Sequence, residues 1–222
     1  MLGRAVIATG DPAKLDQGID YIRDEVMPVV DAQPGSRGLG MWVNRSTGQV
    51  VVNTVWADEA AQAASDERLR PLRLEALRRL GADSARIQLL EPAVFVQTKP
   101  NEPGDWSRAS EIQHRRERLE ADVAAFADEV LPLIRQIPGV ATVGLLVDRA
   151  DARTVLNVTY DSAESFEASR SAADRLRTGI VARYGAELLD VMEMQVALVG
   201  IRPPMDLPAQ GQPVQFRAEQ TT

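Results

Sequence analysis

The sequence predicts an α+β fold made of two tandem repeats, each with the element order strand, helix, strand, strand, helix, strand. Two observations predict it. The segment DEVMPVVDAQPG (24–35) recurs as DEVLPLIRQIPG (128–139), an offset of 104 residues. The same offset aligns the two copies without a gap as far as residues 81–82, which match residues 185–186. Each copy also alternates between helical and strand-like hydrophobic patterns. Roughly a quarter of about 75 aligned positions are identical, so the chain is a duplicated domain.

The first copy opens with a short apolar run over residues 4–10, which predicts a strand. It stops where Asp11 can cap a helix that has Pro12 in its first turn. Pro28 should kink or shorten the last turn of this helix, because proline lacks the N–H that the helix needs. The helix is predicted from apolar residues spaced three and four apart, namely Leu15, Ile19, Ile22, Val26 and Val29.

A β-hairpin is expected next, with strands over residues 38–43 and 49–56 that are apolar on both faces. A second helix should run from Ala57 to about Leu80, with acidic residues in its first turn and Gly81 as its C-cap. We expect Pro71 to interrupt this helix. The last strand, at residues 85–98, contains Pro92, which predicts an edge position or a bulge.

This order is the ferredoxin-like βαββαβ plan, an antiparallel four-stranded sheet with two helices on one face. We expect the first repeat at residues 1–98, a linker at 99–107 and the second repeat at 108–202. The remaining residues, 203–222, are expected to form a disordered tail.

The second copy should hold a helix over residues 115–136, a hairpin over 140–160, a helix over 162–184 and a strand over 188–201. Its first strand is the weakest prediction, because RASEIQH (108–114) aligns with RAVIATG (4–10) but is much more polar. Either a degenerate strand or an N-terminal extension of the helix fits this segment, and its polarity slightly favours the helix.

A sheet covered by helices on one face leaves the other face bare, and here that face is largely apolar. The duplication therefore predicts that the two repeats pair within the chain, with their sheets face to face around a barrel-like interior. The long last strands would cross between the halves. Further homo-oligomer formation stays open.

Composition excludes several classes of function. The net charge of −7 and a pI near 4.9 argue against nucleic acid or an anionic membrane as the main partner. The absence of Cys excludes disulfides and thiolate metal ligands. The first residues lack a signal-peptide core and no apolar stretch is long enough to span a membrane, so we expect a cytoplasmic protein.

The segment VVNTVWADEAAQAAS (51–65), repeated in weaker form as VLNVTYDSAESFEAS (155–169), resembles the junction between hairpin and helix in the antibiotic biosynthesis monooxygenase (ABM) family. That family belongs to the dimeric α+β barrel superfamily, and the resemblance covers most of both repeats. It implies an intrachain barrel of this kind. Members of the superfamily include cofactor-free monooxygenases, haem-degrading enzymes, isomerases and proteins with no known activity.

Haem degradation in this family uses a His on the second helix. Neither corresponding helix here contains one, and the chain's single His is His114, which we expect to be solvated on the surface. With one His and no Cys, neither a transition-metal site nor a cofactor is expected. The hairpin residues Arg45 and Arg149 and the helix residues Asp24 and Glu25 are also expected to be solvated. No phosphate-binding glycine motif or nucleophile elbow is present.

Asn53 and Asn157 are the candidate catalytic residues, since they occupy the same position of the third strand in both copies. Each amide either polarises a carbonyl or phenolate in the barrel, or is a structural Asn with internal partners. Trp56 and Tyr160 either line a substrate site or cap a core. Trp42 is a third aromatic candidate for substrate binding, and Leu146 replaces it in the second copy.

Two functions are consistent with these residues. The resemblance implies a cofactor-independent monooxygenase acting on an aromatic or polyketide-like small molecule in the barrel. The scarcity of titratable residues on the strands favours a non-catalytic small-molecule-binding or structural, stress-related protein. A cavity larger than about 300 Å³ with convergent polar groups would separate the two.

Overall fold

The computed structural model describes residues 1–202 and 214–215. The chain divides into two compact units, and each is built mainly from one repeat. The first unit contains Met1–Leu90, Glu102–Gly104 and the described part of Met194–Met205. The second unit contains Glu91–Asn101, Asp105–Glu193 and the described part of Asp206–Thr222.

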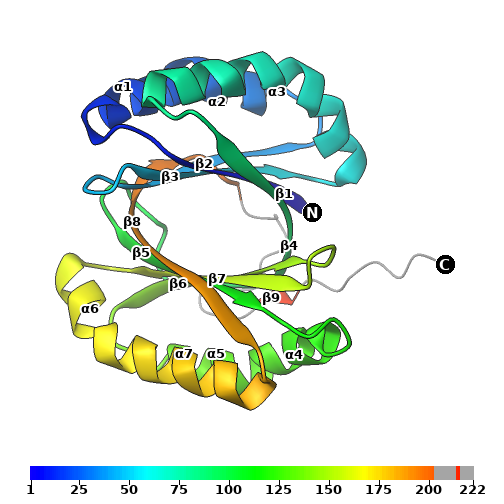
Figure 1. Cartoon of the computed structure of the whole chain (residues 1–222), viewed down its shortest axis with the longest axis vertical. Coiled ribbons are helices and arrows are strands. Elements are labelled where there is room, and N and C mark those ends of the chain that lie inside the picture. The colour runs from blue at the N-terminus through cyan, green and yellow to red at the C-terminus, as the bar shows by residue number, and fades with distance from the viewer. Residues whose placement is uncertain (203–213, 216–222) are drawn as a thin grey trace. The chain divides into compact units, whose positions relative to one another are not determined.

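The sheet of the first unit is antiparallel and has the strand order β4, β1, β3, β2, β8 (Figure 1). The first unit uses the beginning of β4 and the end of β8, so each long last strand contributes to both units. The strands are β1 (Leu2–Thr9), β2 (Ser36–Asn44), β3 (Gln49–Trp56), β4 (Ala85–Gln97) and β8 (Glu187–Val199). Four of them follow the ferredoxin-like order that the sequence predicts.

Helices cover one face of this sheet. They are a short 3-10 turn (Pro12–Lys14), α1 (Leu15–Tyr21), a π-helical turn (Ile22–Val26), α2 (Met27–Asp31) and α3 (Glu59–Leu80). The predicted caps are confirmed: the Asp11 side chain accepts a hydrogen bond from the N–H of Ala13, and Gly81 ends α3 with a positive φ of 68°.

Proline has different effects at Pro28 and at Pro71. Before Pro28 the helix widens into the π-helical turn, which accommodates a residue that cannot donate to the preceding turn. The same arrangement recurs at residues 126–130, before Pro132. The interruption predicted at Pro71 is wrong, because α3 continues through it. Pro71 is exposed, so water can solvate the carbonyl that loses its donor.

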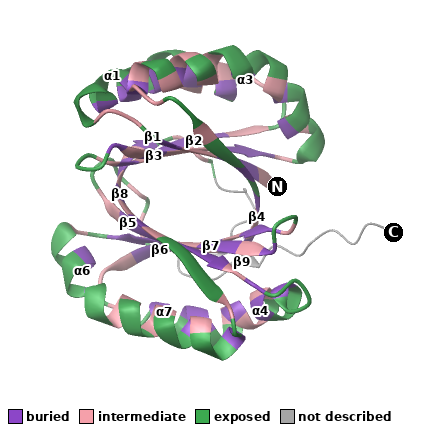
Figure 2. Ribbon diagram, in the orientation of Figure 1, coloured by how far each residue is buried: buried purple, intermediate pink, exposed green. Residues whose placement is uncertain are grey.

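The core of the first unit lies between the sheet and the helices. Along β3, Val50, Thr54 and Trp56 point toward the helices and are buried, whereas alternate residues point to the opposite face. Figure 2 shows the same division on α3, whose outer surface is largely exposed, while β2 and β3 beneath it are buried or intermediate. The packed side chains include Leu15, Ile22, Val30, Leu39 and Met41.

The second unit repeats this plan in the order β8, β5, β7, β6, β4, β9. Its further strands are β5 (Trp106–Gln113), β6 (Val140–Asp148), β7 (Arg153–Tyr160) and the two-residue β9 (Val214–Gln215). Its helices are α4 (Leu119–Ala125), a π-helical turn (Phe126–Val130), α5 (Leu131–Ile134), α6 (Ala163–Ala168) and α7 (Arg170–Tyr184).

The helix favoured for residues 108–114 is wrong, because β5 pairs with β7 along its whole length. Most of its polar side chains are buried, and Nη1 of Arg108, for example, donates a hydrogen bond to the Tyr160 hydroxyl. Polarity therefore did not signal exposure here. At Pro92 the prediction of a bulge is confirmed by a register shift between Pro92 and Val94.

Residues 203–213 and 216–222, most of the predicted tail, lie outside the described part of the chain. Within the described residues, no helix combines the length and the apolar character needed to cross a bilayer.

Candidate functional site

The candidate site lies on the face of the first unit's sheet that carries no helices. Because Val50 and Trp56 point to the helices, the alternate residues of β3 and their cross-strand partners point the other way. We call this surface the helix-free face of the first unit. It includes Gly3, Ala5, Gly40, Trp42, Val51, Asn53 and Val55.

Two polar groups on this face are buried without a hydrogen-bond partner among the described residues: the indole Nε1 of Trp42 and the amide Oδ1 of Asn53. Asn53 pairs with Gly40 across β2 and β3, and Trp42 pairs with Val51. The two side chains are therefore diagonal neighbours on one face, with Cα atoms about 7–8 Å apart. One offers a donor and the other an acceptor.

Glycines make room for both groups. A Cβ at Gly3 would lie 3.2 Å from Oδ1 of Asn53, and a Cβ at Gly40 would lie 2.9 Å from the indole ring of Trp42. The amide and the indole therefore extend over bare backbone, where any larger residue would have to displace them.

The second unit lacks this pair. Oδ1 of Asn157 accepts a hydrogen bond from Ser107 at 2.5 Å, so this amide oxygen has an internal partner. Leu146 stands at the position of Trp42. Nothing lies within 4 Å of the Cβ position at Gly144, the counterpart of Gly40. Of the two asparagines that the sequence singles out, only Asn53 keeps an unused acceptor.

Trp56 and Tyr160 lie on the helix side of their sheets and not with Trp42 and Asn53. Both are fully buried. Trp56 donates from Nε1 to Thr54 at 3.2 Å, and Tyr160 packs edge-on against Phe166. Their positions match the core interpretation of these residues.

His114 is not solvated, contrary to the sequence prediction. Only 7% of it is exposed, and its ring nitrogens lie 3.0 Å from Oδ2 of Asp122 and 2.9 Å from Oγ1 of Thr154. The error follows from the wrong helix, because β5 carries the chain inward to His114. Within the described residues, no group of three His, Cys, Asp or Glu side chains could hold a metal ion.

Of the other residues predicted to lie on the surface, Arg45 and Asp24 are exposed and Arg149 is partly buried. Arg45 is about half exposed and pairs with Asp16, and Asp24 is exposed, as predicted. The hydrogen bonds from Arg23 hold the pKa of Asp24 below its usual value. Arg149 is only partly exposed, because it bridges Glu91 and Glu120.

Sequence reasoning missed the buried carboxylates of Glu111 and Asp122. Glu111 is 2% exposed and points to the helix-free face of the second unit, since it pairs with Val155 on β7. It forms an ion pair with Arg153 at 3.4 Å, and Arg153 also donates to Gln113 at 3.0 Å. Alternation along β5 could have found Glu111 once that segment was assigned as a strand.

The cavities between sheet and helices are small. One of about 50 Å³ lies in the first unit and one of about 40 Å³ in the second. Benzene occupies an engineered cavity of about 150 Å³ in another protein. Neither of these two cavities is large enough for an aromatic ligand of that size.

Solved structures match nearly the whole chain. An anthrone oxidase-like protein matches 89% of this chain and 91% of its own, with a TM-score of 0.66 at 16% identity. The candidate monooxygenase FN1347 from Fusobacterium nucleatum matches 97% and 98%, with a TM-score of 0.66 at 12% identity. A monooxygenase-like protein from Listeria innocua matches 88% and 94%, with a TM-score of 0.51 at 11% identity.

At these identities the likeness concerns the fold alone. It confirms the predicted fold class, an α+β fold built from two tandem ferredoxin-like repeats.

Among curated proteins, the uncharacterized protein Rv2558 of Mycobacterium tuberculosis is 30% identical over 202 residues, which are 90% of this chain and 85% of the relative. The uncharacterized protein Rv2557 of the same organism is 28% identical over 190 residues, 86% of this chain and 84% of the relative. The chain therefore belongs to the family of Rv2558. No family model matches it.

Proposed function

We propose that the protein binds an aromatic small molecule against the helix-free face of the first unit and oxidises it with dioxygen, without a cofactor. The observation that carries the proposal is the pair of buried, unpartnered polar groups, Trp42 Nε1 and Asn53 Oδ1. A buried group without a partner costs about 1–3 kcal/mol, which a ligand that satisfies it would recover. The fold shared with an anthrone oxidase-like protein supports the choice of chemistry.

The two groups set the shape of the ligand. The indole N–H can only donate, so it suits a carbonyl or phenolate oxygen, whereas Oδ1 accepts and suits a hydroxyl. Val51, Val55 and Ala5 supply the apolar surface around them. A fused aromatic ketone that bears a hydroxyl beside its carbonyl offers both groups on one edge.

For an anthrone-type substrate the proposed reaction converts a ring CH₂ and O₂ into a ring C=O and H₂O. A C–O bond forms at the methylene carbon and its two C–H bonds break. The O–O bond also breaks, one oxygen staying in the product and the other leaving as water. The carbon is oxidised and dioxygen is reduced. Asn53 and Trp42 hold the substrate, and the indole N–H of Trp42 donates to the negative oxygen that develops when the methylene loses its first proton.

One observation favours the second candidate function, binding without catalysis. Among the described strands of the first unit, the helix-free face carries no His, Asp or Glu that could accept that proton. A protein that only binds and releases the same ligand would need no such group.

Oxygen uptake and quinone absorbance separate the two functions. They are measured together with 1,8-dihydroxyanthrone, a hydroxyl-bearing anthrone that is the anthrone of all the tests below. Catalysis predicts one O₂ consumed per quinone formed, above the rate of a protein-free blank. Binding alone predicts saturable quenching of tryptophan fluorescence without oxygen uptake. If anthrone neither binds nor reacts, the proposed function is wrong.

The duplication supplies matched controls. Gly40→Ala should displace the indole of Trp42 and weaken anthrone binding about tenfold, whereas Gly144→Ala meets no atom and should leave it unchanged. Equal effects of the two substitutions would remove the helix-free face of the first unit from the site.

A further inference from the structure

A second site lies on the other side of the first unit's sheet, where two arginines reach the cavity of about 50 Å³ beneath α3. Arg4 comes from β1 and Arg73 from α3. Apart from these two residues and Thr54, the lining is apolar, and it includes Val6, Ala8, Val50, Val52, Leu69 and Leu77. The cavity therefore has one cationic end and one hydrocarbon end.

Three guanidinium groups at the cationic end share one carboxylate. Asp66 lies 3.2 Å from Arg4, 2.8 Å from Arg73 and 3.2 Å from Arg70. A second hydrogen bond runs from Nη2 of Arg4 to the backbone oxygen of Gln62, at 3.2 Å. The four charged side chains therefore carry two positive charges in excess.

Arg70 is 67% exposed, but the other two guanidinium groups are poorly solvated. Arg4 is 5% exposed, and the Nη1 atoms of both Arg4 and Arg73 are buried with no partner among the described residues. Desolvation lowers the pKa of Arg4, and the charge of Arg73 lowers it further while Asp66 opposes both. Buried cations without enough anions destabilise the folded protein, so an anion bound here would stabilise it.

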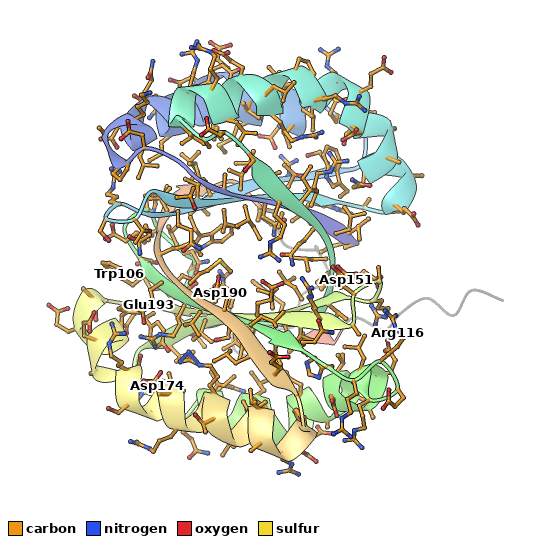
Figure 3. The ribbon with its side chains drawn as sticks, viewed as in Figure 1. Trp106, Arg116, Asp151, Asp174, Asp190 and Glu193 are labelled. Atoms are coloured by element: carbon orange, nitrogen blue, oxygen red, sulfur yellow. The ribbon has the colours of Figure 1, made fainter. Side chains whose placement is uncertain are left out.

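The second repeat shows how the same position is satisfied internally. Arg108, the counterpart of Arg4, pairs with Glu193 at 2.9 Å, and Phe166 stacks on its guanidinium at 4.4 Å. Arg170 pairs with Glu193 and Glu167. Arg177, the counterpart of Arg73, pairs with Asp174. Three carboxylates therefore balance three arginines in the second repeat. Figure 3 labels Glu193 on β8 and Asp174 on α7.

The first repeat lacks the main carboxylate of this arrangement. Position 89 corresponds to 193 and holds Leu89, which is 44% exposed and lies directly opposite Arg4 in the pairing of β1 with β4. Nη2 of Arg108 is also unpartnered, but it has no second free guanidinium nitrogen beside it. Among the described residues, two unpartnered guanidinium nitrogens belong to the lining of one cavity in the first unit, those of Arg4 and Arg73.

We propose that this cavity binds a small aliphatic carboxylate. Its oxygens would accept from the Nη1 atoms of Arg4 and Arg73, and its short chain would occupy the apolar end. Charge-assisted bonds of this kind are the stronger hydrogen bonds in proteins. A water-sized group takes about 10–15 Å³ of such volume, so about 50 Å³ holds about four non-hydrogen atoms, which is the size of acetate. Arg73 and Asp66 are 18% and 35% exposed and mark the entrance.

The test is calorimetric titration of the full chain with acetate, with chloride and sulfate as separate arms. The proposal expects saturable acetate binding and much weaker binding of both inorganic anions. Leu89→Glu supplies the carboxylate that the second repeat has, and should weaken acetate binding at least about tenfold while raising the melting temperature. Leu89→Gln, similar in size but uncharged, should bind as the wild type does.

Arg73→Gln removes one donor and should also weaken binding about tenfold, whereas Arg177→Gln at the equivalent position of the second repeat should not. The melting temperature of each variant shows that it is folded. Three results would overturn the proposal: no acetate binding to the wild type, equal binding of chloride, or acetate binding that survives both Leu89→Glu and Arg73→Gln.

Discussion

Replacing Glu193 with leucine would give the second repeat the residue that the first repeat has at position 89. Glu193 is shared by Arg108 at 2.9 Å and Arg170 at 2.7 Å. After the substitution, Arg108 would keep hydrogen bonds from its Nη1 to Tyr160 and Ser169 but no carboxylate. Its guanidinium is 4% exposed, so water could not replace the lost partner.

The expected cost can be worked from this burial. Breaking a buried ion pair costs about 3–5 kcal/mol. Glu193 is 27% exposed, so solvent screens its charge. This lowers the expected loss in free energy of unfolding to about 2–3 kcal/mol. For a chain of this length, that corresponds to a fall in melting temperature of about 5–10 °C.

The dependence on pH follows from the pKa of Glu193. Burial raises this pKa, but the hydrogen bonds and charges of Arg170 and Arg108 outweigh burial and hold it below the ordinary value of 4.5. Because the folded pKa is depressed, the stabilisation is complete above the unfolded pKa and is lost as the pH falls through the folded pKa. The difference between wild type and Glu193→Leu should therefore be constant near neutral pH and shrink below about pH 4.5.

Urea and thermal unfolding at several pH values measure this difference. The double variant Arg108→Met with Glu193→Leu removes both charges and should recover most of the lost stability. A cost of Glu193→Leu below about 0.5 kcal/mol, or a double variant no more stable than the single one, would refute the assignment of Glu193 as the partner of a buried cation.

Three further predictions concern single positions. Gly38→Ala should destabilise the protein by about 2 kcal/mol or more in urea titrations, since φ is 105° and the Cβ would meet a backbone carbonyl. As its control, Gly179→Ala in α7 meets no atom within 4 Å and should stabilise the protein by about 0.5–1 kcal/mol. His114→Leu should cost about 1–3 kcal/mol in urea unfolding, because the buried Asp122 loses a partner. Asp24→Asn should leave anthrone oxidation unchanged, since an exposed, arginine-paired carboxylate is not the proton acceptor; a large loss of oxygen uptake would contradict this.

The sequence was sufficient to predict the fold, because the duplication and the hydrophobic periods are local signals. The caps at Asp11 and Gly81 were likewise readable from residue type. Two errors arose from the same cause, namely that polar residues were taken as exposed. Residues 108–114 form a buried strand, and His114 follows it into the core, because partners that satisfy these side chains come from distant parts of the chain.

The candidate site was only partly predictable. Asn53 and Trp42 could be named from their positions on neighbouring strands, and hairpin register puts them on one face. The sequence could not show that Asn157 is satisfied by Ser107 whereas Asn53 has no partner, since this depends on side-chain contacts. The excess of arginine at Arg4 was also hidden, because its ion pairs join β1 to a helix about 60 residues further along the chain.

The central claim is that the first repeat, and not the second, holds an aromatic ligand through Asn53 and Trp42. Calorimetric titration with anthrone in the absence of oxygen, where no turnover occurs, tests it most directly. The account predicts one ligand per chain, an affinity about tenfold weaker in Asn53→Leu and an unchanged affinity in Asn157→Leu. Equal affinities in the two variants, or two ligands per chain, would contradict it.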